Sequence, residues 1–122
     1  MEGLTIPRRC ASEHYNLMTD KISVFTKRLA ENPNNRFHRY NLAQAYYDDG
    51  NWHQATEHFK ICFELSPSWM MASLSLAKCY IALENFDLAE GLLIKTIELA
   101  REQQHESPLE EAESLLSMCR SG

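Results

Sequence analysis

The chain has 122 residues, of which 44% are hydrophobic and 24% are charged. This length and composition predict one globular domain and exclude a disordered tail. The formal net charge of −5 argues against a nucleic-acid-binding protein, which would be expected to present a basic face. No stretch approaches a membrane span and the start lacks the pattern of a signal peptide, so we predict a cytoplasmic protein with no membrane partner.

The first predicted element is a helix over residues 12–32, preceded by an N-terminal arm over residues 1–11. Ser12 can cap this helix, and the apolar residues that follow recur at spacings of three and four. These apolar residues are Tyr15, Met18, Ile22, Phe25 and Leu29. The stripe stops before Asn32-Pro33, because the residue before a proline disfavours helical backbone.

The next region, residues 36–67, predicts two helices joined by a tight turn. Gly50 ends the first helix, and Asn51 with Gln54 resembles a capping box that opens the second. The Ser66-Pro67 pair then breaks the chain.

Residues 69–104 predict a second pair of helices, with a turn at Glu84-Asn85. The last helix of this pair should overrun by about one turn or more because no proline ends it. A final helix is predicted over residues 107–120, where Ser107, Pro108 and the acidic residues after them form a start signal.

The two predicted pairs repeat the same residue types at a spacing of 34. The aligned positions are Leu42 with Leu76, Ala43 with Ala77, Tyr46 with Tyr80, Ala55 with Ala89, and Phe63 with Ile97. A repeat of this length is typical of stacked helix pairs.

Written against the tetratricopeptide pattern W-x2-L-G-x2-Y…A-x3-F…P, the first pair departs only at the Trp and Gly positions. It matches at Leu42, Tyr46, Ala55, Phe59 and Pro67. The second pair is looser, since Leu93 stands where the family prefers Phe and Arg101 where it prefers Pro. The chain therefore resembles the tetratricopeptide repeat (TPR) family. Phe25, Leu29 and Pro33 lie one period before Phe59, Phe63 and Pro67, so the first helix resembles the second half of an incomplete unit.

This resemblance implies an all-α fold in which antiparallel helix pairs stack into a right-handed superhelix of about six helices. Residues 12–122 would form one TPR-like domain with repeats over 36–67 and 69–104. The helix over 107–120 would cap the stack, as terminal repeats in such folds require. Small residues at the helix crossings, above all Ala55 and Ala89, should let the paired helices approach closely.

The resemblance also implies a peptide-binding concave surface lined by the first helix of each pair. Carried over by register, its residues are Phe37, Tyr40, Asn41, Gln44 and Tyr47 from one helix, and Met71, Leu74, Ser75, Lys78 and Ile81 from the next. An alternative interpretation places Met71, Leu74 and Ile81 in the core beneath a flanking helix.

We therefore predict a non-enzymatic, adaptor-like or co-chaperone-like module that binds an apolar or amphipathic segment of another protein. A clamp for acidic chaperone tails is disfavoured, because Tyr40 and Leu74 occupy positions where that TPR subgroup carries Lys. The alternative is an assembly subunit whose terminal helices form a homo-oligomer interface.

The sequence holds little site chemistry of other kinds. Its four cysteines include no Cys-x-x-Cys pair, and its five histidines show no metal-ligand spacing. Cys62 takes a position where the family usually has Ala, which predicts a small buried residue. No phosphate-binding loop or nucleophile elbow is present either, so we predict neither a metal, nor a cofactor, nor an enzyme.

Overall fold

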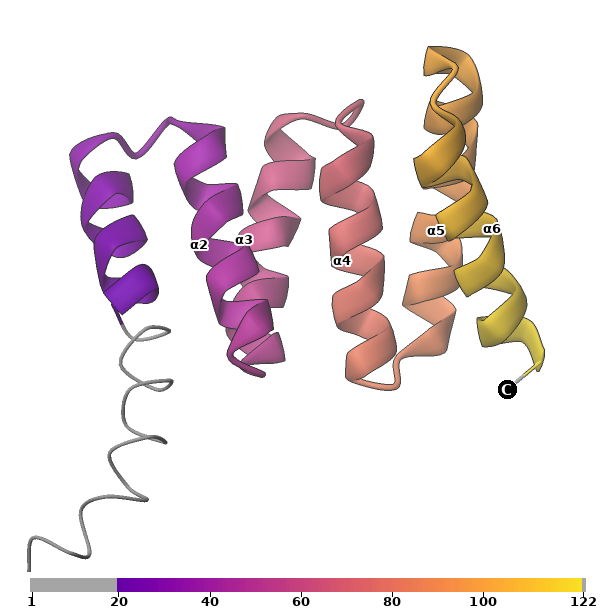
Figure 1. Cartoon of the computed structure of the whole chain (residues 1–122), viewed down its shortest axis with the longest axis horizontal. Coiled ribbons are helices and arrows are strands. Elements are labelled where there is room, and N and C mark those ends of the chain that lie inside the picture. Colours follow the sequence, from indigo (N-terminus) through magenta and orange to yellow (C-terminus); the bar gives the residue numbers. More distant parts are fainter. Residues whose placement is uncertain (1–19, 122) are drawn as a thin grey trace, which may run out of the picture.

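The computed structural model describes residues 20–121, and this part of the chain folds into six helices without a strand. The first covers residues 20–31. It is followed by α2 (Arg36–Asp48), α3 (Trp52–Leu65), α4 (Met70–Ala82), α5 (Phe86–Gln103) and α6 (Glu106–Ser121), as Figure 1 shows. The predicted N-terminal arm, the Ser12 cap, Tyr15 and Met18 lie outside the described residues.

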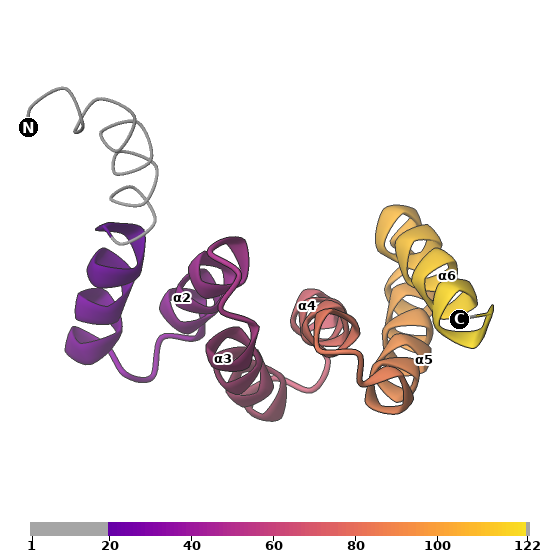
Figure 2. The ribbon, with the colours of Figure 1, turned by 90° about the horizontal axis from the view of Figure 1, so that it is seen from below.

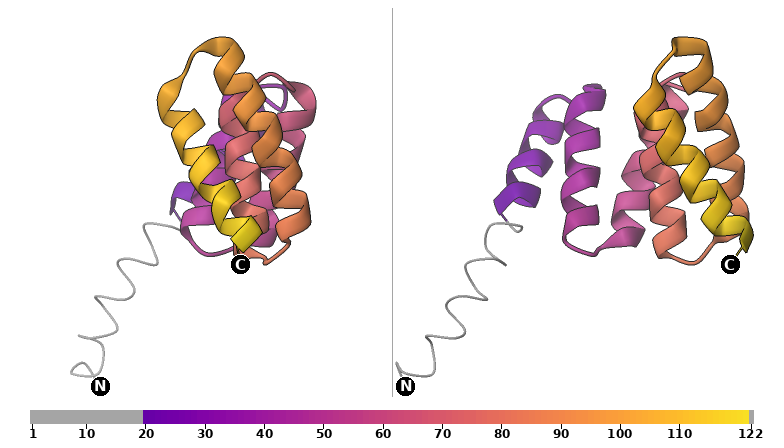
Figure 3. Two further views of the ribbon diagram at one scale, coloured as in Figure 1. Left: turned by 90° about the vertical axis from the view of Figure 1, so that its right-hand side faces the viewer. Right: turned by 45° about the vertical axis from the view of Figure 1, so that its right-hand side comes forward.

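The helices stack in chain order, and each of α2 to α5 packs against the helix that follows it. Figure 2 shows α2, α4 and α6 along one side of the stack and α3 and α5 along the other. Helix α6 lies beside α5 at the C-terminal end in both views of Figure 3, and it also contacts α4. The predicted all-α stack of helix pairs is confirmed.

The first helix of each pair ends in the same way. The N–H of Gly50 donates to the Tyr47 carbonyl (3.0 Å) and that of Asn51 to the Tyr46 carbonyl (2.9 Å), with Gly50 at φ +82°. This is a Schellman motif, in which the residue after the cap adopts a left-handed conformation. Helix α4 repeats these bonds one period later, but its left-handed residue is Glu84 at φ +60°. The turns are therefore in register although their residues differ.

The structure corrects two predicted helix starts. Asn51 makes no side-chain cap bond, because the preceding turn holds its backbone at φ −90° and ψ 73°, outside the extended region that a cap needs. Helix α6 begins at Glu106, so Ser107 and Pro108 lie in its first turn, where the missing proline N–H breaks no helical bond. The side-chain cap that does form is Asn35, whose Oδ1 accepts from the first turn of α2.

Small residues sit at the helix crossings, as predicted. Four alanines there are 0% exposed: Ala43, Ala55, Ala77 and Ala89. Phe59 and Leu76 pack beside the first two of them. Helix α5 has 18 residues against 14 in α3, which is the predicted overrun of about one turn. Its buried Leu93 and Ile97 pack against Ala112 of α6.

Candidate functional site

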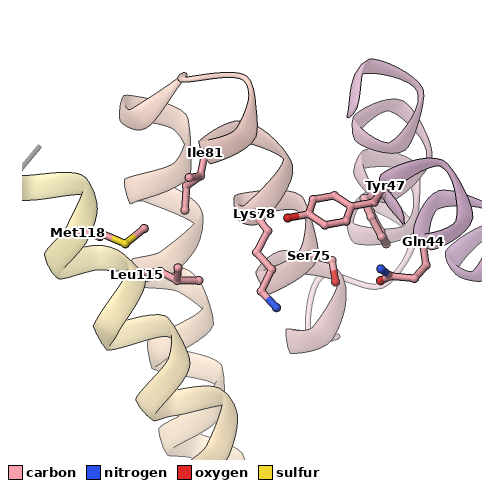
Figure 4. A pocket seen from close by; sticks show the side chains of 8 residues that line it. Gln44, Tyr47, Ser75, Lys78, Ile81, Leu115 and Met118 are labelled. Carbon is pink, nitrogen blue, oxygen red and sulfur yellow. The ribbon is translucent and has the colours of Figure 1, made fainter. Parts of the chain in front are cut away.

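A pocket of about 380 Å³ is lined by residues of four helices of the stack. Figure 4 shows side chains from α2, α4 and α6 around this pocket. The lining residues are Gln44 and Tyr47 from α2, Phe59 from α3, Ser75, Lys78 and Ile81 from α4, and Leu115 and Met118 from α6. These eight residues are called the pocket below. Its walls are mostly apolar, with a few polar groups among them, which is the usual make-up of a ligand site.

The structure brings half of the predicted contact residues together in the pocket. These are Gln44, Tyr47, Ser75, Lys78 and Ile81. Leu74 is 1% exposed and packs against Leu93 and Ala112, so its assignment to a contact surface is corrected to the core. Helix α6 buries it, as the alternative interpretation proposed. Met71 is 40% exposed, so the same alternative is wrong for this residue.

The polar groups of the pocket are already engaged, either within their own helix or with a neighbouring one. Lys78 Nζ lies 2.5 Å from Glu111 Oε2 of α6. Gln44 Nε2 donates to Asp48 Oδ1 over 3.0 Å, and Ser75 Oγ lies 3.0 Å from the Tyr40 hydroxyl. These contacts fix the polar side chains around an apolar centre.

Comparison with known proteins agrees with the fold. A family model described as anaphase-promoting complex, cyclosome, subunit 3 matches residues 14–96, which is more than half of the chain. The chain belongs to this family. The fold of the chain is of the TPR type, as the sequence predicted. No curated protein sequence matches it.

Solved TPR structures share the fold of this TPR domain. A tetratricopeptide repeat domain protein from Salinibacter ruber is 28% identical, with a TM-score of 0.67 over 74% of this chain and 91% of that one. PcrH of Pseudomonas aeruginosa, in complex with the chaperone binding region of PopD, is 17% identical, with a TM-score of 0.80 over 98% and 88%. The first TPR of Spaghetti (RPAP3), bound to the HSP90 peptide SRMEEVD, is 17% identical, with a TM-score of 0.76 over 97% and 89%.

The remaining predicted contact residues of the TPR domain lie outside the pocket. Asn41 is exposed on α2. Phe37 is 56% exposed and meets the Trp69 ring edge-on at 5.5 Å, and the Tyr40 ring lies 5.0 Å from Trp69. Met71 and Trp69 border a second hollow of about 330 Å³ near the start of α4. Tyr40, Trp69 and Phe37 therefore form an aromatic strip that runs toward the start of α2.

Arg36 supports this strip in a way that the sequence analysis missed. Its guanidinium lies 5.1 Å from the Phe37 ring centre and 5.2 Å from that of Trp69, within cation–π range. It also donates to the Ser66 hydroxyl over 2.8 Å. Arg36 thus ties the start of α2 to the turn before α4. The sequence did offer one signal for the start of α2, because Asn35, which precedes Arg36, is a preferred helix-capping residue.

Three pocket residues of the TPR domain were not among the predicted contacts: Phe59, Leu115 and Met118. Phe59 is 0% exposed and forms part of the floor. The other two come from α6, whose apolar stripe in the sequence shows that the helix covers a surface but not which surface. Only the position of α6 beside α4 brings them into the pocket.

The described residues form no metal site, and two of their three cysteine thiols are buried. No three of their His, Cys, Asp or Glu side chains come together as a metal site would require. Burial raises the pKa of the Cys62 and Cys79 thiols to about 11, which keeps them protonated and unreactive near neutral pH. Both are 0% exposed, and Cys62 is the small buried residue that the sequence predicted. No helix of the described part is long and apolar enough to cross a membrane.

Proposed function

We propose that this TPR domain is a non-enzymatic adaptor whose pocket binds a short apolar or amphipathic segment of another protein. The observation that carries the proposal is the composition of the pocket. Tyr47, Ile81, Leu115 and Met118 form apolar walls on three helices, and Met118 is 55% exposed. An apolar side chain of a partner would lose contact with water there, which favours binding.

The structural neighbours support a segment of another protein as the ligand, without specifying its apolar character. PcrH and Spaghetti are each in complex with a segment of another protein, and TPR domains are generally non-catalytic binding modules. An acidic segment fits this pocket less well, because Lys78 is the only charged residue among the described residues that line it. The adaptor role follows from binding a partner without acting chemically on it.

The surface of α5 and α6 that carries their ion pairs is less suited to self-association than to contact with water. Two ion pairs cross it, Arg101 Nη2 to Glu113 Oε2 at 3.2 Å and Arg120 Nε to Glu90 Oε2 at 2.5 Å. A charged outer face is what keeps the end of a helical stack soluble. This surface therefore supports a capping role for α6 more than a homo-oligomer interface.

The test is a selection from a random peptide library on the wild-type chain, followed by affinity measurements with the enriched peptides. We expect enrichment of apolar or amphipathic sequences. Met118→Glu places a charge in the pocket, and a bound segment would bury this charge without a partner. Binding should therefore weaken roughly tenfold, which corresponds to about 1.4 kcal/mol.

The matched control is Leu88→Glu, which introduces the same charge at a side chain on α5 that is 51% exposed and lies outside the pocket. It should leave the affinity unchanged. Equal losses in both variants, or no enrichment on the wild type, would contradict the proposed function.

A further inference from the structure

Lys78 carries the only formal charge among the described residues that line the pocket. Figure 4 shows Lys78 between the pocket residues of α2, Gln44 and Tyr47, and Leu115 of α6. A free lysine in this position would attract a carboxylate of an incoming peptide. In the structure a carboxylate of the chain itself already occupies this position, because Glu111 Oε2 of α6 lies 2.5 Å from the Lys78 Nζ.

The pair is accessible to solvent and to a ligand, since the side chains of Lys78 and Glu111 are 34% and 45% exposed. An acidic ligand would have to compete with a carboxylate that is tethered beside the ammonium and therefore present at a high effective concentration. A displaced Glu111 would remain near the pocket as a like charge and repel the ligand. An apolar side chain bound against Tyr47, Ile81 and Met118 meets neither obstacle.

We propose that Glu111 is a specificity-determining residue of this pocket. By neutralising Lys78, it makes the pocket bind acidic peptides less tightly than apolar segments without acidic residues at the contact. This inference rests on the proposed peptide-binding function and names the class of segment that the same pocket takes. It also gives α6 a second task, because the helix that buries Leu74 and Leu93 supplies the selecting charge.

The experiment compares two synthetic heptapeptides by fluorescence anisotropy. One is SRMEEVD, the acidic peptide bound by Spaghetti. The other is its neutral analogue SQMQQVN with an acetylated N-terminus and an amidated C-terminus, which has the same length and no charged group. The wild-type chain should bind the neutral peptide more tightly than the acidic one.

In Glu111→Gln the Lys78 ammonium is released, and affinity for the acidic peptide should rise about two- to fivefold, the range expected of a partly exposed ion pair. Affinity for the neutral peptide should not change. The gain should disappear when Lys78→Gln is added to Glu111→Gln. Glu113→Gln is the matched control, since it removes a glutamate from the same helix whose partner is Arg101 of α5.

Four results would overturn the proposal: no binding of the acidic peptide to Glu111→Gln, equal changes for both peptides, an equal gain in Glu113→Gln, or a gain that persists without Lys78. Thermal melts by circular dichroism verify that each variant is folded. Failure of the proposed function is a separate result, because it is read from the library selection on the wild-type chain. The effect of Glu111 is read from the ratio between the two heptapeptides.

Discussion

At the scale of single residues, His58 of α3 shows how a polar side chain is held inside the helix pair. Its ring stacks on Tyr46 with ring centres 5.7 Å apart and planes within 4°. Arg39 Nη1 lies 3.2 Å from His58 Nδ1, a contact in which the guanidinium donates and the neutral imidazole accepts. Burial, and then the positive charge of Arg39, lower the pKa of His58 below 6.5, while Glu57 partly opposes the shift.

This lowered pKa predicts a loss of stability in mild acid. Above pH 6.5 His58 is neutral in both the folded and unfolded chain, so its contribution is fully present. As pH falls from 6.5 toward the lowered folded pKa, the unfolded chain binds the proton first and the folded state loses stability. Urea melts between pH 8 and pH 5 should show this slope, and His58→Gln should reduce it.

The control is His53→Gln, which changes an exposed histidine at the start of the same helix. It should leave the pH dependence as in the wild type. A slope that survives His58→Gln unchanged would show that another group causes it.

At the scale of helices, the two repeats end their first helices with the same hydrogen bonds but with different residues. Gly50 adopts its positive φ without steric cost, whereas Glu84 carries a Cβ in the left-handed region. The neighbouring bonds to Tyr80 and Ile81 hold Glu84 in this conformation. The second repeat therefore stores backbone strain that the first does not.

Glu84→Gly should relieve this strain and stabilise the protein by about 0.5–1 kcal/mol. Chemical denaturation would show it as a higher midpoint. The reciprocal change, Gly50→Ala, should destabilise by a similar amount through strain alone, because a Cβ at Gly50 would meet no atom within 4 Å. A lower midpoint for Glu84→Gly would contradict this prediction. It would mean that the Glu84 side chain stabilises the fold by more than its backbone strain costs.

At the scale of the whole molecule, α6 closes the C-terminal end of the stack. It covers Leu93 and Ile97 of α5 with Ala112 and contributes Leu115 and Met118 to the pocket. One helix thus serves both stability and the proposed binding site.

Truncation after Glu106 should therefore be costly. It would expose several buried apolar side chains, each worth roughly 1.5–3 kcal/mol, and lower the melting temperature by roughly 10 °C or more. Circular dichroism melts measure the loss, and sedimentation would detect association through the exposed apolar end. A truncated chain with an unchanged melting temperature would reduce α6 to a loosely attached tail.

The sequence by itself was enough to predict the fold. The spacing of 34 residues, the alanines at the crossings and the left-handed turn at Gly50 are local or periodic features, and each helix pair contacts mainly its neighbours. In such a stack the pattern of one unit determines its packing on the next. The local start signals were less reliable, because Asn51 and Ser107 have the residue types of a cap but not its backbone conformation.

The tertiary structure alone decided the candidate site. Register predicted Gln44, Tyr47 and Lys78 on one side, and all three line the same pocket. Whether Leu74 faces a ligand or the core depends on where α6 lies. The position of α6 follows from the length of α5 and the turn after it, which no repeat specifies. The pairing of Lys78 with Glu111 joins residues 33 positions apart, one less than the period. Such a contact is not encoded in either helix and exists only once α6 packs against α4.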